Sequence, residues 1–527
     1  MSLIFDMAKL NGSTFFEEED WDSFSAIANL TGFNAIDIFS GSIEYDIYGV
    51  PRLNGGLFAR PITIVGQSAT GKTSLAIKVI AASVDRWNRM YGAELSEMVM
   101  DDSEDNSTIH RIQGLTGWSD WEFMSRCRYY NKVMSINDIY NQVREIADLK
   151  EKNRKALTVD TGIMDIDGYT IKVLSPTYLL VDSIAALSGD GATDLEFDKD
   201  GKLKESEKMV GNVDAMTEAR GNTAFIKKVK AYLSKYNIVL IMINHIIEKP
   251  QMGMFDFPTR VLPFLKPGER LKGGNELVYQ SFAIWNLNYK TKIDDKDPIY
   301  GDRIRGAVTH LIFVKSKSNV EGLPVPMVFD QRTGHRPELS DWEYIYNASY
   351  GIGGSPARYF LKILPEITFT RKGLYDACLD NPLLARALSF TARCKMVTDV
   401  IVTDHDRRAV APDMQALTDN MSYENRVALI LTFTDIYPGY DHSKNQLDAN
   451  TMEIALNHQK YIMANDSHVE ENRSYIFSES LYLDLLDIPG EGEVKCIPFS
   501  NVLATPFDER ILGVDGEPNY IFTSEEV

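Results

Sequence analysis

Short apolar runs alternate along the chain with segments whose apolar residues recur at helical spacing. The runs, which resemble buried strands, are Ile62 to Val65, Tyr178 to Val181 and Ile238 to Ile243. The helical spacing occupies 74–83, 135–147 and 213–235. Ser135 or Asn137 is suited to cap the second of these helices. Strands that alternate with helices predict an α/β fold with a mostly parallel sheet and helices on its faces.

The remaining pattern divides the chain into three expected parts. Residues 1–55, with an acidic run and then turn residues, predict a small N-terminal element that serves in oligomerisation. Residues 56–340 hold the alternating strands and helices and form the expected core. Residues 341–527 have mixed spacing, which predicts an enlarged α+β C-terminal region of accessory domains. Within that region the pattern is helix-like at 378–396 and 423–435 and β-like near 494–523.

Two long segments of the core lack apolar periodicity. Residues 188–212 carry seven acidic residues and four lysines, and residues 246–272 are rich in proline, glycine and basic residues. Loops longer than about 12–15 residues inside a compact domain are usually functional or unstructured. We therefore expect two functional loops.

Composition narrows the class of protein. The chain has 527 residues, of which 44% are hydrophobic and 25% are charged, so it is expected to fold and is neither a fibre nor a largely disordered polymer. Its formal net charge of -20 excludes a chain-wide attraction to phosphate, as in histone-like packing of DNA. Any contact with nucleic acid must therefore come from a local basic surface.

The chain shows no sign of a membrane or secreted protein. No stretch approaches the roughly 20 apolar residues of a membrane span, and the N-terminus, with Asp6 in its first apolar stretch, lacks the basic region of a signal peptide. The four cysteines show no CxxC pairing and are expected to be reduced and structural. These observations predict an intracellular, cytoplasmic protein without a membrane partner.

A phosphate-binding motif lies between the first predicted strand and the first predicted helix. It fits GxxxxGK[ST] and, with the next residue, comprises Gly66, Gln67, Ser68, Ala69, Thr70, Gly71, Lys72, Thr73 and Ser74. In such a loop the backbone N–H groups surround phosphate oxygens, the lysine reaches the β and γ phosphates, and the hydroxyl of Thr73 can ligate Mg²⁺. The motif predicts ATP and Mg²⁺ as cofactors.

Two further groups are needed for hydrolysis. Asp182, which closes the second apolar run, is suited to hold the Mg²⁺ shell together with Thr73. A group that orients the attacking water is expected after the strand that follows the first helix, where 98–105 ends in four carboxylates. An acidic run is by itself more often a solvated loop.

Several sequence blocks in order resemble the RecA family of DNA recombinases, and most of all its phage UvsX branch. Besides the phosphate loop at 66–73, they are Asp101-Asp102-Ser103-Glu104, Leu180-Val181-Asp182-Ser183, Ile241-Met242-Ile243-Asn244-His245, Lys272-Gly273-Gly274-Asn275-Glu276-Leu277 and Phe313-Val314-Lys315-Ser316-Lys317. The resemblance covers roughly residues 56–340. It implies a RecA-like, DNA-dependent ATPase that forms a filament on single-stranded DNA, pairs it with homologous duplex and exchanges strands.

The resemblance also implies roles for single residues. Glu104 matches the family's water-activating glutamate, Asp182 its Mg²⁺-shell aspartate, and His245 the polar residue that senses the γ phosphate. Lys315 and Lys317 match lysines that reach the γ phosphate of the neighbouring protomer. On a strand, residues two apart point the same way, so both ammonium groups are expected to approach one target. Alone, each of these residues also has a structural interpretation, such as a solvated strand edge for the lysines.

DNA contacts are expected from the two loops and from the helix between them. Segments 188–212 and 246–272 fall where the family has its DNA-binding loops, and the second has a net charge of +2. Its basic residues are Lys249, Arg260, Lys266, Arg270 and Lys272. Arg220 and Lys227 match basic DNA-contacting positions, and their spacing of seven puts them on one face of the helix. The first loop is acidic, so its direct contact with phosphate stays open.

Two other functions remain open alternatives. A hexameric DNA helicase shares this type of ATPase core, and a regulator or scaffold could bind ATP without exchanging strands. The expected partners of the recombinase are single-stranded and duplex DNA, further copies of the chain, and mediator or single-strand-binding proteins. Compared with compact members of the family, Asp182 lies far from Lys72, which predicts an insertion at 157–176.

Overall fold

The computed structural model describes a large part of the chain. Its described residues are 28–45, 51–91, 95–132, 134–164, 170–184, 187, 212–248, 262, 264–266, 268–271, 276–293, 300, 304–317, 321–400, 402–403, 407–408, 413–420, 423, 426–427 and 430. The predicted loop 188–212 therefore lies outside them except for Asn212, as does most of loop 246–272. The predicted β-like segment 494–523 also lies outside, with everything beyond residue 430.

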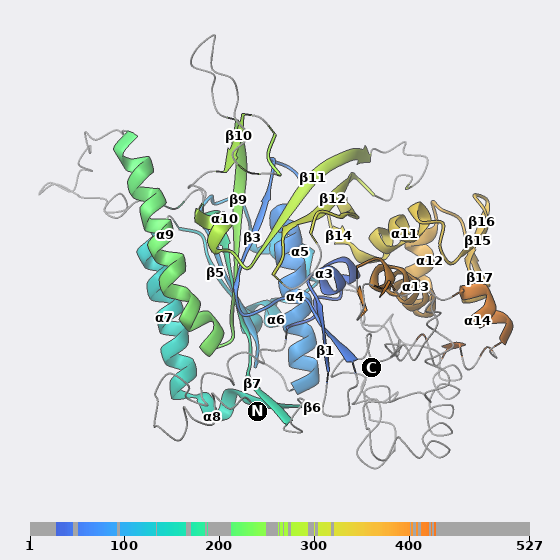
Figure 1. The fold of residues 1–527 in the computed structure, drawn as a ribbon, viewed down its shortest axis with the longest axis horizontal. Helices are drawn as coiled ribbons and strands as arrows, with labels where there is room; N and C mark the ends of the chain where they lie inside the picture. The colour runs from blue at the N-terminus through green and yellow to red at the C-terminus, as the bar shows by residue number, and fades with distance from the viewer. Residues whose placement is uncertain are drawn as a thin grey trace, which may run out of the picture.

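A ten-stranded sheet forms the centre of the described structure, and most of it is parallel (Figure 1). Its parallel part, in spatial order, consists of β11 (Ala283–Ile293), β3 (Pro61–Gly66), β9 (Ile238–Glu248), β8 (Thr177–Asp182), β4 (Glu97–Asp102) and β5 (Cys127–Tyr130). The apolar runs of the sequence become strands because both faces of a parallel sheet are covered. The α/β fold with a mostly parallel sheet is confirmed.

Antiparallel strands extend the sheet beyond β11. They are β12 (Gly306–Lys315), β13 (Pro324–Asp330) and β14 (Gly334–Arg336). A short strand, β10 (Glu269–Leu271), pairs with the end of β9, with Leu271 opposite Ile246. The predicted loop 246–272 is thus wrong at both ends, because its first and last residues satisfy their backbone groups as a strand pair.

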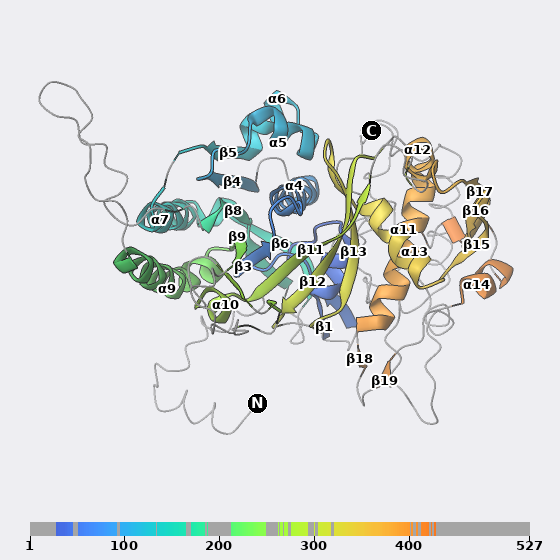
Figure 2. The ribbon, with the colours of Figure 1, turned by 90° about the horizontal axis from the view of Figure 1, so that it is seen from above.

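Helices cover both faces of the sheet (Figure 2). On one face, helix α4 (Lys72–Tyr91) buries Leu75, Val79 and Val84 in the large core. On the other face, α7 (Ile136–Lys152) and α9 (Asn212–Lys235) pack side by side, and their apolar residues form a second core with alternate residues of β4, β8 and β9. Ser135 caps α7, as the sequence predicts, in a capping box with Asp138.

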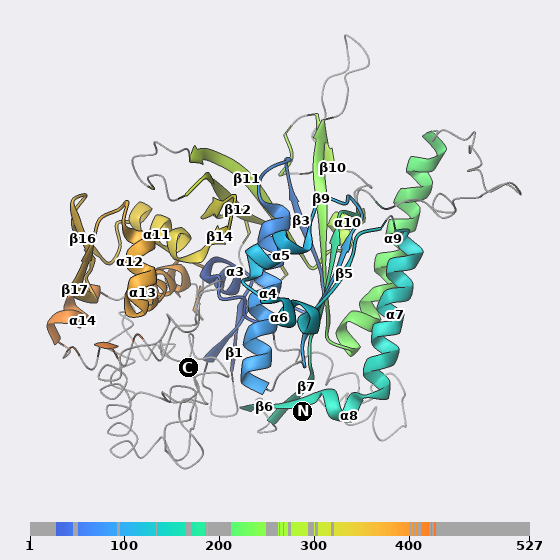
Figure 3. The same cartoon turned by 180° about the vertical axis from the view of Figure 1, so that it is seen from behind.

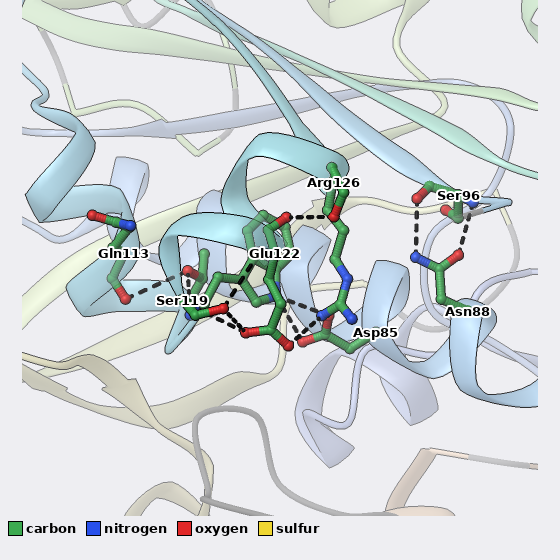
Figure 4. Close-up of polar contacts among 10 residues, drawn as sticks. Asp85, Asn88, Ser96, Gln113, Ser119, Glu122 and Arg126 are labelled. Carbon is green, nitrogen blue, oxygen red and sulfur yellow. Dashed lines mark hydrogen bonds and ion pairs between the residues drawn. The ribbon is translucent and has the colours of Figure 1, made fainter. Parts of the chain in front are cut away.

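Two short helices, α5 (Ile109–Thr116) and α6 (Asp120–Arg126), are attached to α4 by polar contacts (Figure 4). Asp85 of α4 accepts hydrogen bonds from the indole of Trp118, at 2.8 Å, and from Arg126, at 2.9 Å. Arg126 also pairs with Glu122, whose side chain completes the capping box of α6 with Ser119. These contacts fix the segment that follows β4.

The segment predicted as an insertion forms a hairpin apart from the central sheet (Figure 3). Its strands, β6 (Thr158–Met164) and β7 (Thr170–Leu174), pair with each other in a two-stranded sheet. Helix α8 (Arg154–Leu157) connects it to α7. A second two-stranded sheet consists of β1 (Ser42–Tyr45) and β2 (Pro51–Asn54).

The N-terminal and C-terminal parts of the described chain pack against each other. Helix α3 (Asn34–Phe39) contacts α11 (Pro337–Asn347) and α13 (Pro382–Val400). The side-chain amide of Asn34 donates to Asp341 at 2.7 Å and to the Ser389 hydroxyl at 2.9 Å. The expected boundary at residue 340 differs from the structure, because it falls inside α11, whose Leu339 and Trp342 belong to the large core.

The C-terminal elements beyond α11 are small. They are β15 (Ile352–Ser355), β16 (Arg358–Leu361) and β17 (Leu364–Phe369), which form one sheet, followed by α12 (Leu374–Asp380), α13, β18 (Val402–Thr403), β19 (Arg407–Arg408) and α14 (Met414–Asn420). The predicted helix at 378–396 spans α12 and α13, which are separated near Asn381. Among the described residues, no helix has the length and apolar character of a membrane span.

Candidate nucleotide-binding site

The candidate site lies where four parallel strands end. Gly66 at the end of β3 is paired with His245 on β9, and Asp102 at the end of β4 is paired with Asp182 at the end of β8. In open α/β sheets, ligands bind outside the carboxyl ends of the strands. The sequence blocks that are far apart along the chain therefore meet at one edge of the sheet.

The loop between β3 and α4 has the backbone that a phosphate cradle needs. Ala69 and Gly71 have φ values of 61° and 84°, so the chain turns sharply before α4 begins at Lys72. The Thr70 hydroxyl and the Lys72 ammonium both donate to the carbonyl of Gln67, at 3.0 and 2.7 Å. The N-terminus of a helix twenty residues long then faces the loop, which favours an anion there.

Lys72 is mostly buried, and its charge is correspondingly less stable than in water. Burial lowers the pKa of Lys72 to about 8, although the nearby carboxylates of Asp182 and Glu104 oppose this change. A bound triphosphate would supply the negative charge that these two carboxylates supply only in part. The lysine is therefore suited to an anionic ligand.

Asp182 and Thr73 are the residues that could hold Mg²⁺. The Thr73 hydroxyl donates to Asp182 Oδ2 at 2.6 Å. Burial, together with the charges of Glu104 and Asp102, raises the pKa of Asp182 to about 6, against the opposing effects of Thr73 and Lys72. A divalent cation would relieve this repulsion, so the residues fit the ion. The described residues contain no group of three or more His, Cys, Asp or Glu that could hold a metal by themselves, which agrees with an ion that phosphate oxygens help to bind.

Glu104 is held at the same edge by three side chains. It accepts hydrogen bonds from the Ser183 hydroxyl, which follows β8, and from the Asn106 amide at 2.8 Å. His245 Nε2 lies 3.0 Å from the same carboxylate. Burial alone would raise the pKa of Glu104, but the contacts with Ser183 and His245 outweigh it and hold the pKa below its usual value. Glu104 is thus ionised at neutral pH and can accept a proton.

The other carboxylates of the acidic run have structural partners. Asp102 accepts hydrogen bonds from the Ser107 amide, at 2.8 Å, and from the Tyr129 hydroxyl, at 3.1 Å. Asp101 points to the opposite face, where Gln142 of α7 donates to it at 3.2 Å. Burial raises the pKa of Asp101 to about 6. Only Glu104, among 101–104, contacts residues at the ends of both β8 and β9.

Sequence reasoning missed the residues that support the phosphate loop from behind. A side chain at Gly71 would lie 2.8 Å from the ring of His335 and 3.1 Å from Phe329. His335, on β14, is fully buried, and burial, with the charge of Lys78, lowers its pKa to about 3. The antiparallel end of the sheet thus touches the loop directly. No motif marks this contact, because it depends on how β13 and β14 fold back over α4.

The two lysines after the sixth apolar block differ from the sequence expectation. Strand β12 ends at Lys315, so strand alternation does not extend to Lys317, which is exposed beyond the strand. The Lys315 ammonium donates to the carbonyls of Val278 and Tyr279, at 2.7 and 2.9 Å, in helix α10 (Glu276–Gln280). Lys315 is thus held within its own chain in this structure.

The expected DNA-contacting residues are placed unevenly. Lys227 is exposed on α9, and Arg220 lies on the same helix with its side chain outside the described residues. Lys266 and Arg270 are exposed near β10. The other basic residues of the second loop, which lie outside the described residues, are Lys249, Arg260 and Lys272. The structure therefore brings together the expected ATP residues but describes only some of the expected DNA residues.

Comparisons with known proteins give one structural similarity to report. No family model and no curated protein matches the chain. The chain is similar to a solved structure of the ATPase domain of a replicative helicase, with 13% sequence identity, a TM-score of 0.35, and coverage of 63% of this chain and 97% of that one. The chain's own geometry is that of a mixed α/β fold with a P-loop at the carboxyl edge of a mostly parallel sheet.

Proposed function

We propose that the protein is an ATP-dependent recombinase of the RecA type, closest to the phage UvsX branch. It forms filaments on single-stranded DNA and catalyses homologous pairing and strand exchange in recombination, repair and replication. Its ATPase activity depends on DNA. The ordered sequence blocks support the family, and the meeting of Lys72, Thr73, Asp182 and Glu104 at one edge supports ATP hydrolysis.

The contact between Glu104 and His245 is the observation that carries the proposal. His245 lies on β9, and the same strand continues to Glu248 and pairs there with β10. The proposed second DNA loop connects these two strands. A movement of this loop on DNA would therefore be transmitted along β9 to the hydrogen bond that holds the carboxylate of Glu104. This link gives a direct path from DNA binding to hydrolysis.

In the proposed reaction, each residue has one task. Lys72 and the backbone of the phosphate loop bind the triphosphate, and Mg²⁺, when bound by Thr73 and the Asp182 shell, neutralises charge on the transferred phosphoryl group. Glu104 accepts the proton of the attacking water. Lys315 and Lys317 act on the neighbouring protomer, which requires Lys315 to leave the carbonyls of α10.

The remaining expectations belong to the same proposal. Single-stranded DNA is bound by the two loops and by Arg220 and Lys227, and duplex DNA is the second substrate. Residues 1–55 serve in self-association, and residues 341–527 serve an accessory role. Mediator and single-strand-binding proteins are the proposed partners in the cytoplasm, including a host cytoplasm or phage replication compartment.

Electron microscopy tests the proposal against its alternatives. The full chain is mixed with single-stranded DNA and a slowly hydrolysed ATP analogue, and strand exchange is measured with ATP in parallel. An open helical filament together with exchange supports the recombinase. A closed ring that unwinds a fork indicates a helicase. Nucleotide binding without either assembly indicates a regulator or scaffold.

A further inference from the structure

A basic strip with tyrosines runs along the outer face of α9. Between residues 224 and 236, this helix and the residue after it carry four lysines and no acidic residue, in a chain with a net charge of -20. The inner face of the same segment is apolar, because Phe225, Ile226, Val229 and Leu233 are buried in the second core. The lysines are therefore held on the outside by the packing of the helix. They are Lys227, Lys228, Lys230 and Lys235.

Three tyrosines connect this strip across the two helices of the outer layer, visible together at one side of the sheet (Figures 1 and 2). Tyr140 of α7 meets Tyr232 of α9 edge to face, with ring centroids 6.4 Å apart. Tyr232 in turn stacks on Tyr236, again with centroids 6.4 Å apart. The rings form a continuous base for the charged side chains that cover them.

Cations lie over two of these rings. Lys228 and Arg144 lie 5.6 and 6.0 Å from the ring centre of Tyr140, and Lys235 and Arg154 both lie 5.7 Å from that of Tyr236. Arg154 also pairs with Glu151, so part of its charge is compensated. A cation held on a ring keeps its charge while losing side-chain freedom. Lys228, Lys235 and Arg144 are therefore exposed and partly preorganised charges.

We propose that this strip binds the phosphate backbone of duplex DNA as a site separate from the two loops. Lysines without neighbouring acids on the same segment are complementary to a polyanion. Because cations cover Tyr140 and Tyr236, these rings are poorly placed to stack on the bases of a single strand, the usual use of aromatic residues there. Lys228 and Lys235 lie seven residues apart, about 10 Å along the helix, which is near three base steps at about 3.4 Å.

The inference rests on the proposed function, because it assigns a place to the second DNA substrate of a recombinase. It predicts a duplex-binding surface that begins on the helix after the first expected DNA loop and continues toward α8. Acidic residues on α7, among them Glu145 and Asp148, limit the strip on that side. The strip is therefore narrow, as expected for contact with one phosphate strand.

Salt-dependent binding of the full chain to a labelled duplex of about 30 base pairs tests this surface. The variant Arg144→Ala, Lys228→Ala, Lys235→Ala is expected to reduce the slope of log affinity against log salt by about two to three, at about 0.9 for each lost phosphate contact. The ATPase activity on single-stranded DNA is expected to stay within about twofold of wild type. Melting temperatures verify that the variant is folded.

Matched variants separate this site from a general loss of charge. Arg358→Ala, Lys372→Ala, Lys132→Ala removes three exposed cations elsewhere, one of them also over a tyrosine ring, and is expected to bind duplex as wild type does. Arg144→Lys, Lys228→Arg, Lys235→Arg keeps the charges and is expected to retain the slope.

Three outcomes would overturn the inference. If wild type binds duplex and the alanine variant has the same slope, duplex is bound elsewhere. If the variant binds duplex normally but no longer assembles into filaments, the strip contacts another copy of the chain. If wild type hydrolyses ATP on single-stranded DNA but binds no duplex, the inference fails while the proposed function stands. Loss of DNA-stimulated ATPase activity in wild type would instead contradict the proposed function itself.

Discussion

His245 Nε2 lies 3.0 Å from Glu104 Oε1, although 141 residues separate them in the chain. The contact joins the end of the segment after β4 to a strand in the middle of the sheet. His245 sits where β9 leaves the sheet edge and continues toward β10. The proposed catalytic carboxylate is thus held by a strand that also leads to the proposed DNA loop.

His245→Leu is expected to uncouple hydrolysis from DNA. The apolar side chain cannot hydrogen-bond Glu104, so nucleotide binding and slow basal turnover should persist while stimulation by single-stranded DNA falls at least tenfold. Steady-state ATPase rates with and without DNA measure the effect. His245→Gln, which can still donate to the carboxylate, is the control and should keep most of the stimulation. Equal stimulation in His245→Leu and wild type would contradict the coupling.

Glu104→Gln is expected to bind ATP with nearly wild-type affinity and to lose turnover by about 10²-fold or more. An amide can retain the contacts with Ser183 and Asn106, but it cannot accept the proton of the attacking water. Nucleotide affinity and single-turnover hydrolysis on DNA measure the two properties separately. Asp102→Asn serves as a comparison, since Asp102 has backbone and Tyr129 partners. A Glu104→Gln protein with wild-type turnover would remove Glu104 from the catalytic role.

ATP affinity is expected to fall as the pH rises above about 8. In the nucleotide-free protein the pKa of Lys72 is lowered to about 8, and phosphate binding favours the protonated lysine. Above this pH, binding must therefore take up a proton, and affinity should fall toward tenfold per pH unit. Affinity for a fluorescent ATP analogue between pH 7 and pH 9.5 measures this. Lys72→Arg should flatten the profile, since arginine stays charged.

Lys315→Ala with Lys317→Ala is expected to bind ATP through Lys72 but to lose cooperative assembly and hydrolysis on DNA. If these lysines act on the neighbouring protomer, mixing this variant with Lys72→Ala should restore DNA-dependent ATPase activity, because some interfaces then combine an intact phosphate loop with intact lysines. Co-assembly of the two variants without any restored activity would show that the lysines do not act between subunits.

Lys150→Met is expected to destabilise the fold by about 3 kcal/mol or more. The buried Lys150 ammonium donates to the carbonyls of Ser175, Tyr236 and Asn237, at 2.7, 2.9 and 3.1 Å, and methionine would leave these acceptors unpaired. Urea unfolding measures the loss. Burial lowers the pKa of Lys150 to about 7, below its unfolded value, so its charging penalty is complete below pH 7 and is relieved as pH rises from about 7 to 10. Wild type should gain stability over that range relative to the variant.

Local patterns were sufficient for the elements that build the phosphate loop. An apolar run, a glycine-rich turn and helical spacing predict β3 and the start of α4, and Asp182 was recognisable because it ends an apolar run. Ser135 was recognisable as a cap for the same reason: each signal lies within a few residues of the structure that it predicts. Periodicity and capping act over one or two turns of chain, so they can be read directly.

Contacts between distant segments depend on the fold and have no local signal. The order of strands in the sheet determines that Glu104 meets His245, and the fold of β13 and β14 over α4 determines that His335 meets Gly71. The packing of Asn34 with Ser389 likewise joins segments that the sequence pattern assigned to different domains. Residue types and motif spacing thus identify the groups that can do the chemistry, whereas the arrangement of the strands selects which of these groups meet, because side-chain packing across a sheet leaves no local periodicity in the chain.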